Sequence, residues 1–226
     1  MKLPGVLSAI FSAVVFAVSL VSAPLTHASS YDDMLKSVKL GDIATVRNLL
    51  GRGMDVNTSD REGNTLLMLA ARENRTELAR LFIRERAKLN ARNMHGDSAL
   101  KIAAYNGSLD IVRELVQAGA EIDTEGWTPL IYAAFNGHDD IVEFLLQQGA
   151  GIDARSESGM TALMAAARGG FLPIVDRLLA AGASVNLHDA NGESALDWAN
   201  KTKNTNIAAR LEAAGGQPGK KPRRRR

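Results

Sequence analysis

The sequence predicts an all-α fold, a solenoid in which short helix–turn–helix units stack along one axis. A glycine recurs at positions 63, 96, 126, 159 and 192, in steps of 33, 30, 33 and 33 residues. Hydrophobic residues make up 46% of the chain and aromatic residues only 5%, so alanine and leucine must fill the core. Small side chains suit closely stacked helices, and a fixed period of this length is typical of repeat architectures.

Each recurring glycine starts the same pattern. A hydroxyl side chain stands two residues after it, a leucine four residues after it, and an alanine pair follows. The hydroxyls are Thr65, Ser98, Thr128, Thr161 and Ser194; the leucines are Leu67, Leu100, Leu130, Leu163 and Leu196; the first alanine pair is Ala70-Ala71. A register held over about 150 residues indicates five copies of one unit.

The first helix of each unit is predicted to begin at the hydroxyl, which can accept backbone N–H bonds as an N-cap. Asn136-Gly137 and its equivalents end that helix in a tight turn, because both residues tolerate positive φ. A second apolar set at helical spacing, such as Asp140 to Leu146, predicts the second helix, which Gly149-Ala150 ends. One helix pair cannot bury its apolar face alone, so the units must stack.

The unit resembles the ankyrin repeat, on Thr128-Pro129-Leu130 with Ala133-Ala134 and on Gly-Ala-x-Ile/Val-Asn/Asp between units. The resemblance implies a solenoid with projecting β-turn fingers and about six units including caps, over residues 29–216. The units are a cap at 31–62, repeats at 63–95, 96–125, 126–158 and 159–191, and a C-terminal cap at 192–216. One connection, Asp123 to Gly126, is three residues shorter than its counterparts, so one finger is clipped.

Residues 1–28 are predicted to be a signal peptide. Lys2 precedes an apolar stretch from about Val6 to Val21, and Thr26 and Ala28 form a plausible cleavage site. The alternative is an uncleaved anchor, since residues 3–25 are just long enough to span a bilayer. Cleavage near Ala28 predicts a protein of the bacterial periplasm or a secreted protein.

Residues 217–226 are predicted to be a basic, disordered tail. Lys220, Lys221 and Arg223 to Arg226 carry six positive charges; without them and Lys2, 20 basic side chains stand against 25 acidic ones, a net charge of −5. The simplest interpretation is a solvated extension. Weak contact with an anionic surface and a nuclear address in a eukaryotic host are alternatives. No specific binding to nucleic acid follows from a charge confined to one end.

Catalytic and metal-binding residue patterns are not found. The chain has no cysteine, and His95, His138 and His188 are not spaced as metal ligands. His138 follows a turn glycine and is expected to support the turn. Asp139-Asp140 lie at a predicted helix start, where the macrodipole favours carboxylates. We therefore expect no enzyme activity, no metal and no cofactor.

The family resemblance implies protein recognition on a concave face, formed by the finger tips and the exposed side of each first helix. The contact positions implied for the middle of the array hold large side chains flanked by arginines. These candidate partner-binding residues are Trp127, Phe135, Tyr105, Met160, Arg72 and Arg168. Aromatic residues and arginine dominate binding hot spots. The clipped finger should open a pocket beside Trp127.

Alternatives stay open both for these residues and for the function. Trp127 and Phe135 can instead simply pack together to cover the clipped finger, and Tyr132 and Trp198, which replace core leucines, are expected to be structural. The predicted function is a periplasmic scaffold or protective binder, monomeric, with one protein partner. The alternatives are a secreted effector that engages host proteins through the same face and, in a different class, an enzyme or redox-protective factor.

Overall fold

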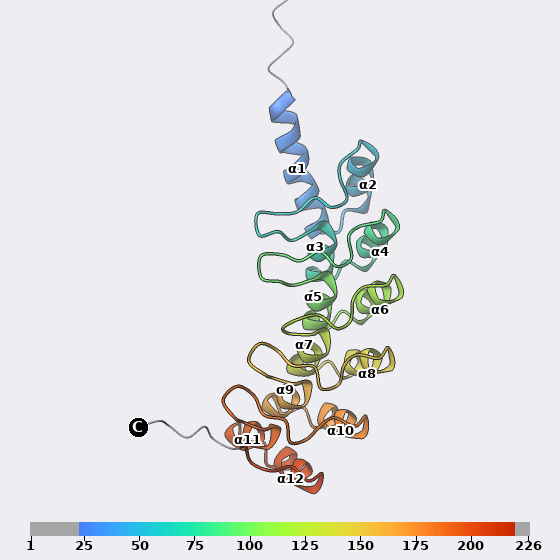
Figure 1. Cartoon of the computed structure of the whole chain (residues 1–226). Coiled ribbons are helices and arrows are strands. Elements are labelled where there is room, and N and C mark those ends of the chain that lie inside the picture. The colour runs from blue at the N-terminus through green and yellow to red at the C-terminus, as the bar shows by residue number, and fades with distance from the viewer. Residues whose placement is uncertain (1–22, 220–226) are drawn as a thin grey trace, which may run out of the picture.

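A computed structural model describes residues 23–219, and the named secondary-structure elements in this part of the chain are all helices (Figure 1). The helices are α1 Ala23–Leu40, α2 Ile43–Gly51, α3 Leu66–Arg72, α4 Thr76–Arg84, α5 Ala99–Asn106, α6 Leu109–Gln117, α7 Pro129–Asn136, α8 Asp139–Gln147, α9 Ala162–Gly169, α10 Leu172–Ala180, α11 Ala195–Lys201 and α12 Thr205–Ala213. They form six antiparallel pairs, so the predicted all-α solenoid is confirmed.

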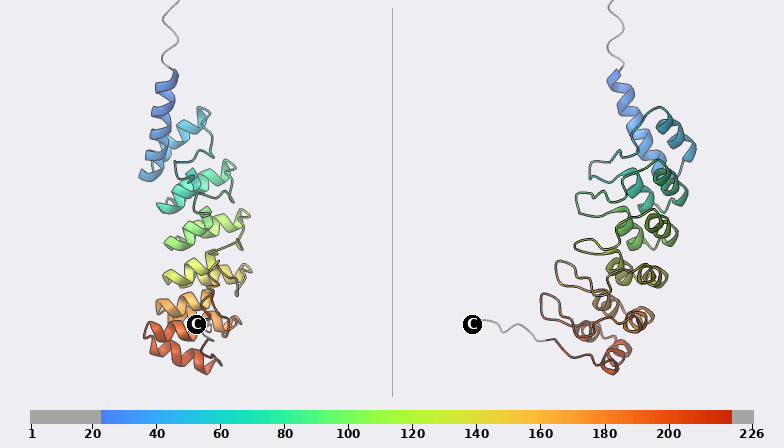
Figure 2. Two further views of the ribbon diagram at one scale, coloured as in Figure 1. Left: turned by 60° about the vertical axis from the view of Figure 1, so that its left-hand side comes forward. Right: turned by 45° about the vertical axis from the view of Figure 1, so that its right-hand side comes forward.

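The pairs stack with the odd-numbered helices in one column and the even-numbered helices in another. Between pairs, a loop projects to one side as a finger, and the stack bends toward that side in its C-terminal half (Figures 1 and 2). The fingers and the exposed sides of α3, α5, α7, α9 and α11 therefore form the concave face.

The recurring hydroxyls start the first helices as predicted. Thr65, Ser98, Thr128, Thr161 and Ser194 each accept a hydrogen bond from the backbone N–H three residues later. The alanine pairs that follow are fully buried, which lets neighbouring helices approach closely. At Gly137 the chain turns with φ of 81°, and the Phe171 ring of the next repeat lies where a β-carbon would be, so glycine is required twice over.

Asparagine and aspartate side chains join each repeat to the next, on the loop side of the second helices. Asn57 Oδ1 accepts the Lys88 N–H at 2.8 Å, and Asn90 Oδ1 accepts the Glu121 N–H at 3.0 Å. The same bond recurs in three later pairs: Asp123 with Gly151, Asp153 with Ser184, and Asn186 with Gln217. This ladder explains why the Asn/Asp of the interrepeat pattern recurs in every unit.

The last bond of the ladder corrects one predicted boundary. Gln217 was assigned to the disordered tail, yet residues 217–219 are held against the last repeat, with Gly219 N–H bonded to Asp197 Oδ2 at 2.6 Å. The physical reason is that the chain after α12 follows the path of an interrepeat connection, so the same side-chain acceptors are available. The remainder of the predicted tail, 220–226, lies outside the described residues.

The N-terminal cap consists of α1 and α2. The predicted signal peptide lies mostly outside the described residues, and α1 begins at Ala23 and continues through the expected cleavage site at Ala28. Cleavage therefore stays a prediction. None of the helices between residues 23 and 219 is both long enough and apolar enough to cross a membrane.

Candidate functional site

The clipped finger differs from its neighbours in how it is held. In the finger before it, Asn93 Oδ1 accepts the N–H groups of His95 and Asp97, which closes the turn. Asp60 and Asp189 do the same in the first and fifth fingers. Asp123 stands at the corresponding distance from Gly126 but is already used in the interrepeat ladder. The clipped finger therefore has no side chain of its own to close a full turn.

A lysine takes over the contact between the second finger and the clipped one. Lys101 is buried on α5, and its Nζ donates to Gly96 O at 3.3 Å and Glu125 O at 3.0 Å. Burial lowers the pKa of Lys101 below its ordinary value. The first and second fingers meet directly through the backbone, with Met94 N–H donating to Glu62 O, and the fourth and fifth do so through Ala190 N–H and Ser158 O. The lysine thus bridges a gap that the three missing residues leave open.

Aromatic side chains form a continuous row over this gap. Tyr105 on α5 meets Tyr132 on α7 edge to face, with ring centroids 5.7 Å apart. Tyr132 lies 5.2 Å from Trp127, and Trp127 lies 5.4 Å from Phe135, again edge to face. The Arg168 guanidinium on α9 stacks over Phe135 at 5.4 Å. Such pairs are favourable beyond the area they bury.

The structure therefore brings together four of the six predicted residues, namely Tyr105, Trp127, Phe135 and Arg168. The contact between Tyr105 and the others runs through Tyr132, which is not one of the six. Tyr132 was expected to be structural, and it links Tyr105 to Trp127. The packing of Trp127 against Phe135 also agrees with the alternative that these rings cover the clipped finger.

An open hollow of about 410 Å³ lies beside the row. Tyr105 and Tyr132 form its aromatic wall, and Arg72 lies on the side of the preceding repeat. The remaining lining residues are Glu62, Asn93, His95, Asp97, Lys101, Ile102 and Asn106. Trp127 does not line it, so the predicted pocket is displaced toward the second finger. The reason is that the Tyr132 ring, in contact with Trp127, fills the place next to it.

Met160 is a correction to the predicted site. It was expected to face outward, but only 5% of its surface is exposed, and its N–H donates to Ser156 Oγ at 3.1 Å. The residue after the glycine differs in burial between fingers: Asn64 and Met160 are buried, whereas Asp97, Trp127 and Glu193 are half-buried. Met160 is buried because its apolar side chain packs into the hydrophobic core.

Two exposed apolar side chains belong to this region. Tyr105 lines the hollow and is 50% exposed, and Met94, which lies in the chain between the lining residues Asn93 and His95, is 76% exposed. On the same aromatic wall, the Tyr132 hydroxyl donates to Asp97 Oδ1 at 3.2 Å, and burial together with Asp97 raises the pKa of Tyr132 to about 12. The hollow therefore combines an aromatic wall with neutral and charged hydrogen-bonding groups, a combination suited to a protein surface.

Lys101, Tyr132 and Met94 are site residues that were not among the predicted six. A signal for Lys101 exists in the sequence, since the same repeat position holds Met68, Ile131 and Met164. A lysine at a position that is apolar in these other repeats must either be buried or indicate a local change in structure. His138 was predicted to support the turn at Gly137, and its Nε2 contacts Tyr105 O of the preceding repeat at 3.0 Å. Among the described residues, no group of three or more His, Cys, Asp or Glu side chains is placed to hold a metal ion.

Comparison with known proteins identifies the class of protein. The family described as "Ankyrin repeats (3 copies)" matches residues 34–125, 90–156 and 148–221. The chain therefore belongs to the ankyrin-repeat family. It is similar to an ankyrin repeat domain from Acinetobacter baumannii, with 31% identity and a TM-score of 0.73 over 81% of this chain and 98% of that one.

A second solved structure gives the same match. It is the predatory endopeptidase of Bdellovibrio bacteriovorus in complex with an immunity protein, and the matched chain has 31% identity and a TM-score of 0.73, over 80% of this chain and 97% of that one. Among curated proteins, the palmitoyltransferase Hip14 of Drosophila melanogaster is 37% identical over 103 residues, 44% of this chain but 16% of its own length. The mouse protein "fem-1 homolog A-like" is 35% identical over 79 residues, 34% of this chain and 12% of its own.

The family sets the general function. Ankyrin repeats are protein–protein interaction modules, and the fold is generally non-enzymatic. The likeness to the palmitoyltransferase extends only to its ankyrin region. The chain spans less than a fifth of the length of these curated relatives, so their whole-protein activities are not transferred by the match.

Proposed function

We propose that this chain is a non-catalytic binder that holds one protein partner on its concave face and acts as a scaffold or protective binder in the bacterial periplasm. The observation that carries the proposal is the aromatic row beside the open hollow, with Tyr105 exposed on its wall and Met94 exposed on the finger that lines it. Exposed aromatic side chains around a concave, partly apolar site are where binding energy concentrates.

The likeness to one solved structure and the predicted signal peptide favour a protective role over a purely structural one. The chain is similar over 80% of its length to a chain in a complex between an endopeptidase and an immunity protein. The predicted signal peptide would place this chain in the envelope, where such an enzyme would need to be held inactive. A binder of this kind needs an occluding surface and no catalytic group, which is consistent with the site described above.

A secreted effector is the second candidate, and it would use the same face on a host protein. The predicted leader supports export as such and does not distinguish the two destinations. Cell fractionation does: recovery of a processed chain in the periplasm supports the protective binder, and recovery in the culture medium supports the effector.

The binding proposal is tested by affinity capture from an envelope extract of the native organism, with mass spectrometry of what is retained. Wild type is compared with the double variant Tyr105→Ala, Met94→Ala. Both side chains are exposed, so their loss should leave the fold intact. Leu40→Ala is the matched control, because Leu40 is 66% exposed at the end of α1, away from the hollow.

We expect one protein to be retained by wild type and by the control and lost by the double variant. A hot-spot pair of this kind contributes about 2 kcal/mol or more to binding. Equal recovery by all three forms would contradict binding at the hollow. Turnover of a substrate that a single polar substitution abolishes would contradict a non-catalytic role.

A further inference from the structure

The two repeat units that carry the aromatic row are strongly acidic. Residues 96–158 hold 11 of the 25 acidic side chains of the chain but only 3 of its 27 lysines and arginines, which gives a net charge of −8. In the unit before them, residues 63–95, seven basic side chains stand against three acidic ones, and in residues 159–219 the two kinds are equal, at five each. Negative charge is therefore concentrated in the units that form the site.

The three basic side chains of these units are all engaged with the protein itself. Lys101 is buried, and its ammonium is held by two backbone carbonyls. Arg113 on α6 lies over the Phe144 ring at 5.7 Å, among the second helices. Arg155 donates to the backbone oxygen of His188 in the next unit. The acidic charge on the finger side of these units is thus not covered by their own cations.

Each of the three middle fingers brings a carboxylate to the aromatic row. Asp97 in the second finger accepts the Tyr132 hydroxyl at 3.2 Å. Glu157 in the fourth finger reaches across the clipped finger, and its carboxylate lies where a β-carbon at Gly126 would collide with it. Burial, Asp97 and Glu157 all raise the pKa of Tyr132, so both carboxylates act on the same ring. Glu125 belongs to the clipped finger itself and is exposed.

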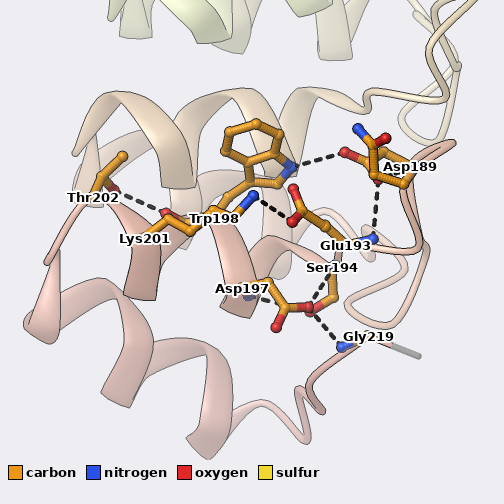
Figure 3. Close-up of polar contacts among 9 residues, drawn as sticks. Asp189, Glu193, Ser194, Asp197, Trp198, Lys201, Thr202 and Gly219 are labelled. Atoms are coloured by element: carbon orange, nitrogen blue, oxygen red, sulfur yellow. Dashed lines mark hydrogen bonds and ion pairs between the residues drawn. The ribbon is translucent and has the colours of Figure 1, made fainter. Parts of the chain in front are cut away.

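These carboxylates lack the cationic partner found at the end of the array. Among the described residues, the side chains of Glu125 and Glu157 make no hydrogen bond and no ion pair, and both are exposed. In the fifth finger, Glu193 is paired with Lys201, whose ammonium also lies 4.8 Å from the Trp198 ring (Figure 3). The charge of the fifth finger is therefore neutralised within the chain, whereas that of the middle fingers is open to a partner.

Cations border this acidic centre on both sides. Arg72, in the preceding unit, lines the hollow, and Arg92, at the start of the second finger, acts on the charge of Lys101. Arg168, in the following unit, lies over the Phe135 ring at 5.4 Å. These arginines repel a bound cation at either end of the row, so they restrict it to the centre.

We infer that the surface formed by Tyr105, Trp127 and the carboxylates of Asp97, Glu125 and Glu157 binds a lysine or arginine side chain on a basic face of the protein partner. The inference rests on the proposed function and adds the chemistry of the partner. The charged head would meet the carboxylates, and the stem would lie along the half-exposed Tyr105 ring, where a cation also gains from the π face. Charge of one sign gathered at the site also speeds encounter with a partner of the opposite sign.

The test uses the full chain, as the cell processes it, and a fluorescein-labelled hexa-arginine peptide as the basic probe, with binding followed by anisotropy. The site variant turns the three carboxylates into amides: Asp97→Asn, Glu125→Gln, Glu157→Gln. We expect it to weaken binding about tenfold or more, and added salt to weaken binding of wild type, because these charges are exposed. The matched control removes the same charge from the same two units on the side of the second helices: Asp110→Asn, Glu121→Gln, Asp140→Asn. It should weaken binding by less than about threefold, and thermal unfolding checks that both variants are folded.

Equal weakening by the site variant and the control variant would overturn the inference, because the overall field of the two units would then account for binding. Tighter binding of an oligoglutamate peptide than of hexa-arginine would overturn it as well.

The capture experiment separates this inference from the proposed function. The captured protein should be lost by the site variant as it is by Tyr105→Ala, Met94→Ala. Its retention by the site variant, together with its loss by Tyr105→Ala, Met94→Ala, would overturn the basic partner and leave the proposed function standing. Retention by both variants would overturn the two together.

Discussion

The Gly151 N–H donates to both carboxylate oxygens of Asp123, at 3.0 and 2.9 Å. In the other connections, one Asn or Asp joins the repeats and a separate residue closes the finger. The clipped finger is three residues shorter. Asp123 therefore still joins the two repeats, and no separate residue remains to close the finger. The open hollow and the row of rings follow from that choice, because a full finger would otherwise occupy the gap.

Asp123→Ala should lower the free energy of unfolding by about 1 kcal/mol, since it removes the acceptor of a hydrogen bond between repeats. Asp123→Asn should cost much less, because the amide oxygen can accept as Asn57 and Asn90 do. Urea unfolding of the three proteins measures the difference. Equal losses for the alanine and asparagine variants would show that the charge, and not the acceptor, matters.

Tyr132 is expected to titrate at about pH 12, well above its ordinary value of 10.0, because burial and the neighbouring Asp97 disfavour the phenolate. Its folded-state pKa is raised, so the stability it contributes is present below pH 10.0 and is lost as pH rises through the folded-state value. Ultraviolet titration of wild type against Tyr132→Phe isolates this group. A difference between the two curves centred near 10.0 instead would place the phenol in solvent.

The sequence predicted what is repeated and missed what departs from the repeat. The N-caps, the buried alanine pairs and the turn at Gly137 are set by neighbours within one unit, and the periodicity is enough to find them. Met160 and Trp127 hold one repeat position but differ in exposure, because Met160 packs into the core whereas the Trp127 ring packs against Tyr132 and Phe135. The role of Tyr132 depends on contacts with Tyr105 and Trp127, which only the packed array defines.

Asp139 should contribute to stability in a pH-dependent way. The Arg177 side chain bonds both its carboxylate oxygens at 2.8 Å and lowers the pKa of Asp139 below 3.8. With the folded-state pKa depressed, the contribution is present above pH 3.8 and is lost as pH falls through the folded-state value. Both side chains are partly exposed, so solvent screening limits the effect of Asp139→Asn at neutral pH to about 0.5 kcal/mol.

The measurement is the difference in unfolding free energy between wild type and Asp139→Asn as a function of pH. The difference should shrink toward zero in acid. Asp140→Asn is the matched control, because Asp140 lies in the same first turn of α8 without an ion pair among the described residues. A pH-independent difference for Asp139→Asn would mean that the pair with Arg177 does not form in solution.

Leu145→Ala should destabilise the array by about 2–5 kcal/mol, because truncation of a buried leucine leaves a cavity between packed helices. Leu145 is fully buried on α8, in the middle of the stack, where the loss affects both neighbours. Leu40→Ala at the exposed end of α1 should change stability by less than about 0.5 kcal/mol. Similar values for the two variants in thermal and urea unfolding would contradict the described packing.

Trp127→Ala separates the two interpretations of the aromatic row. If Trp127 is part of the binding surface, its loss should weaken binding of the captured partner by about 2 kcal/mol or more. The accompanying loss of stability should stay below that of Leu145→Ala, because Trp127 is only half-buried and packs on one side, against Tyr132 and Phe135. Trp127→Phe keeps an aromatic ring in place and should preserve much of both properties. A fall in melting temperature as large as that of Leu145→Ala, with partner affinity unchanged, would assign Trp127 to covering the clipped finger and leave binding to Tyr105 and Met94.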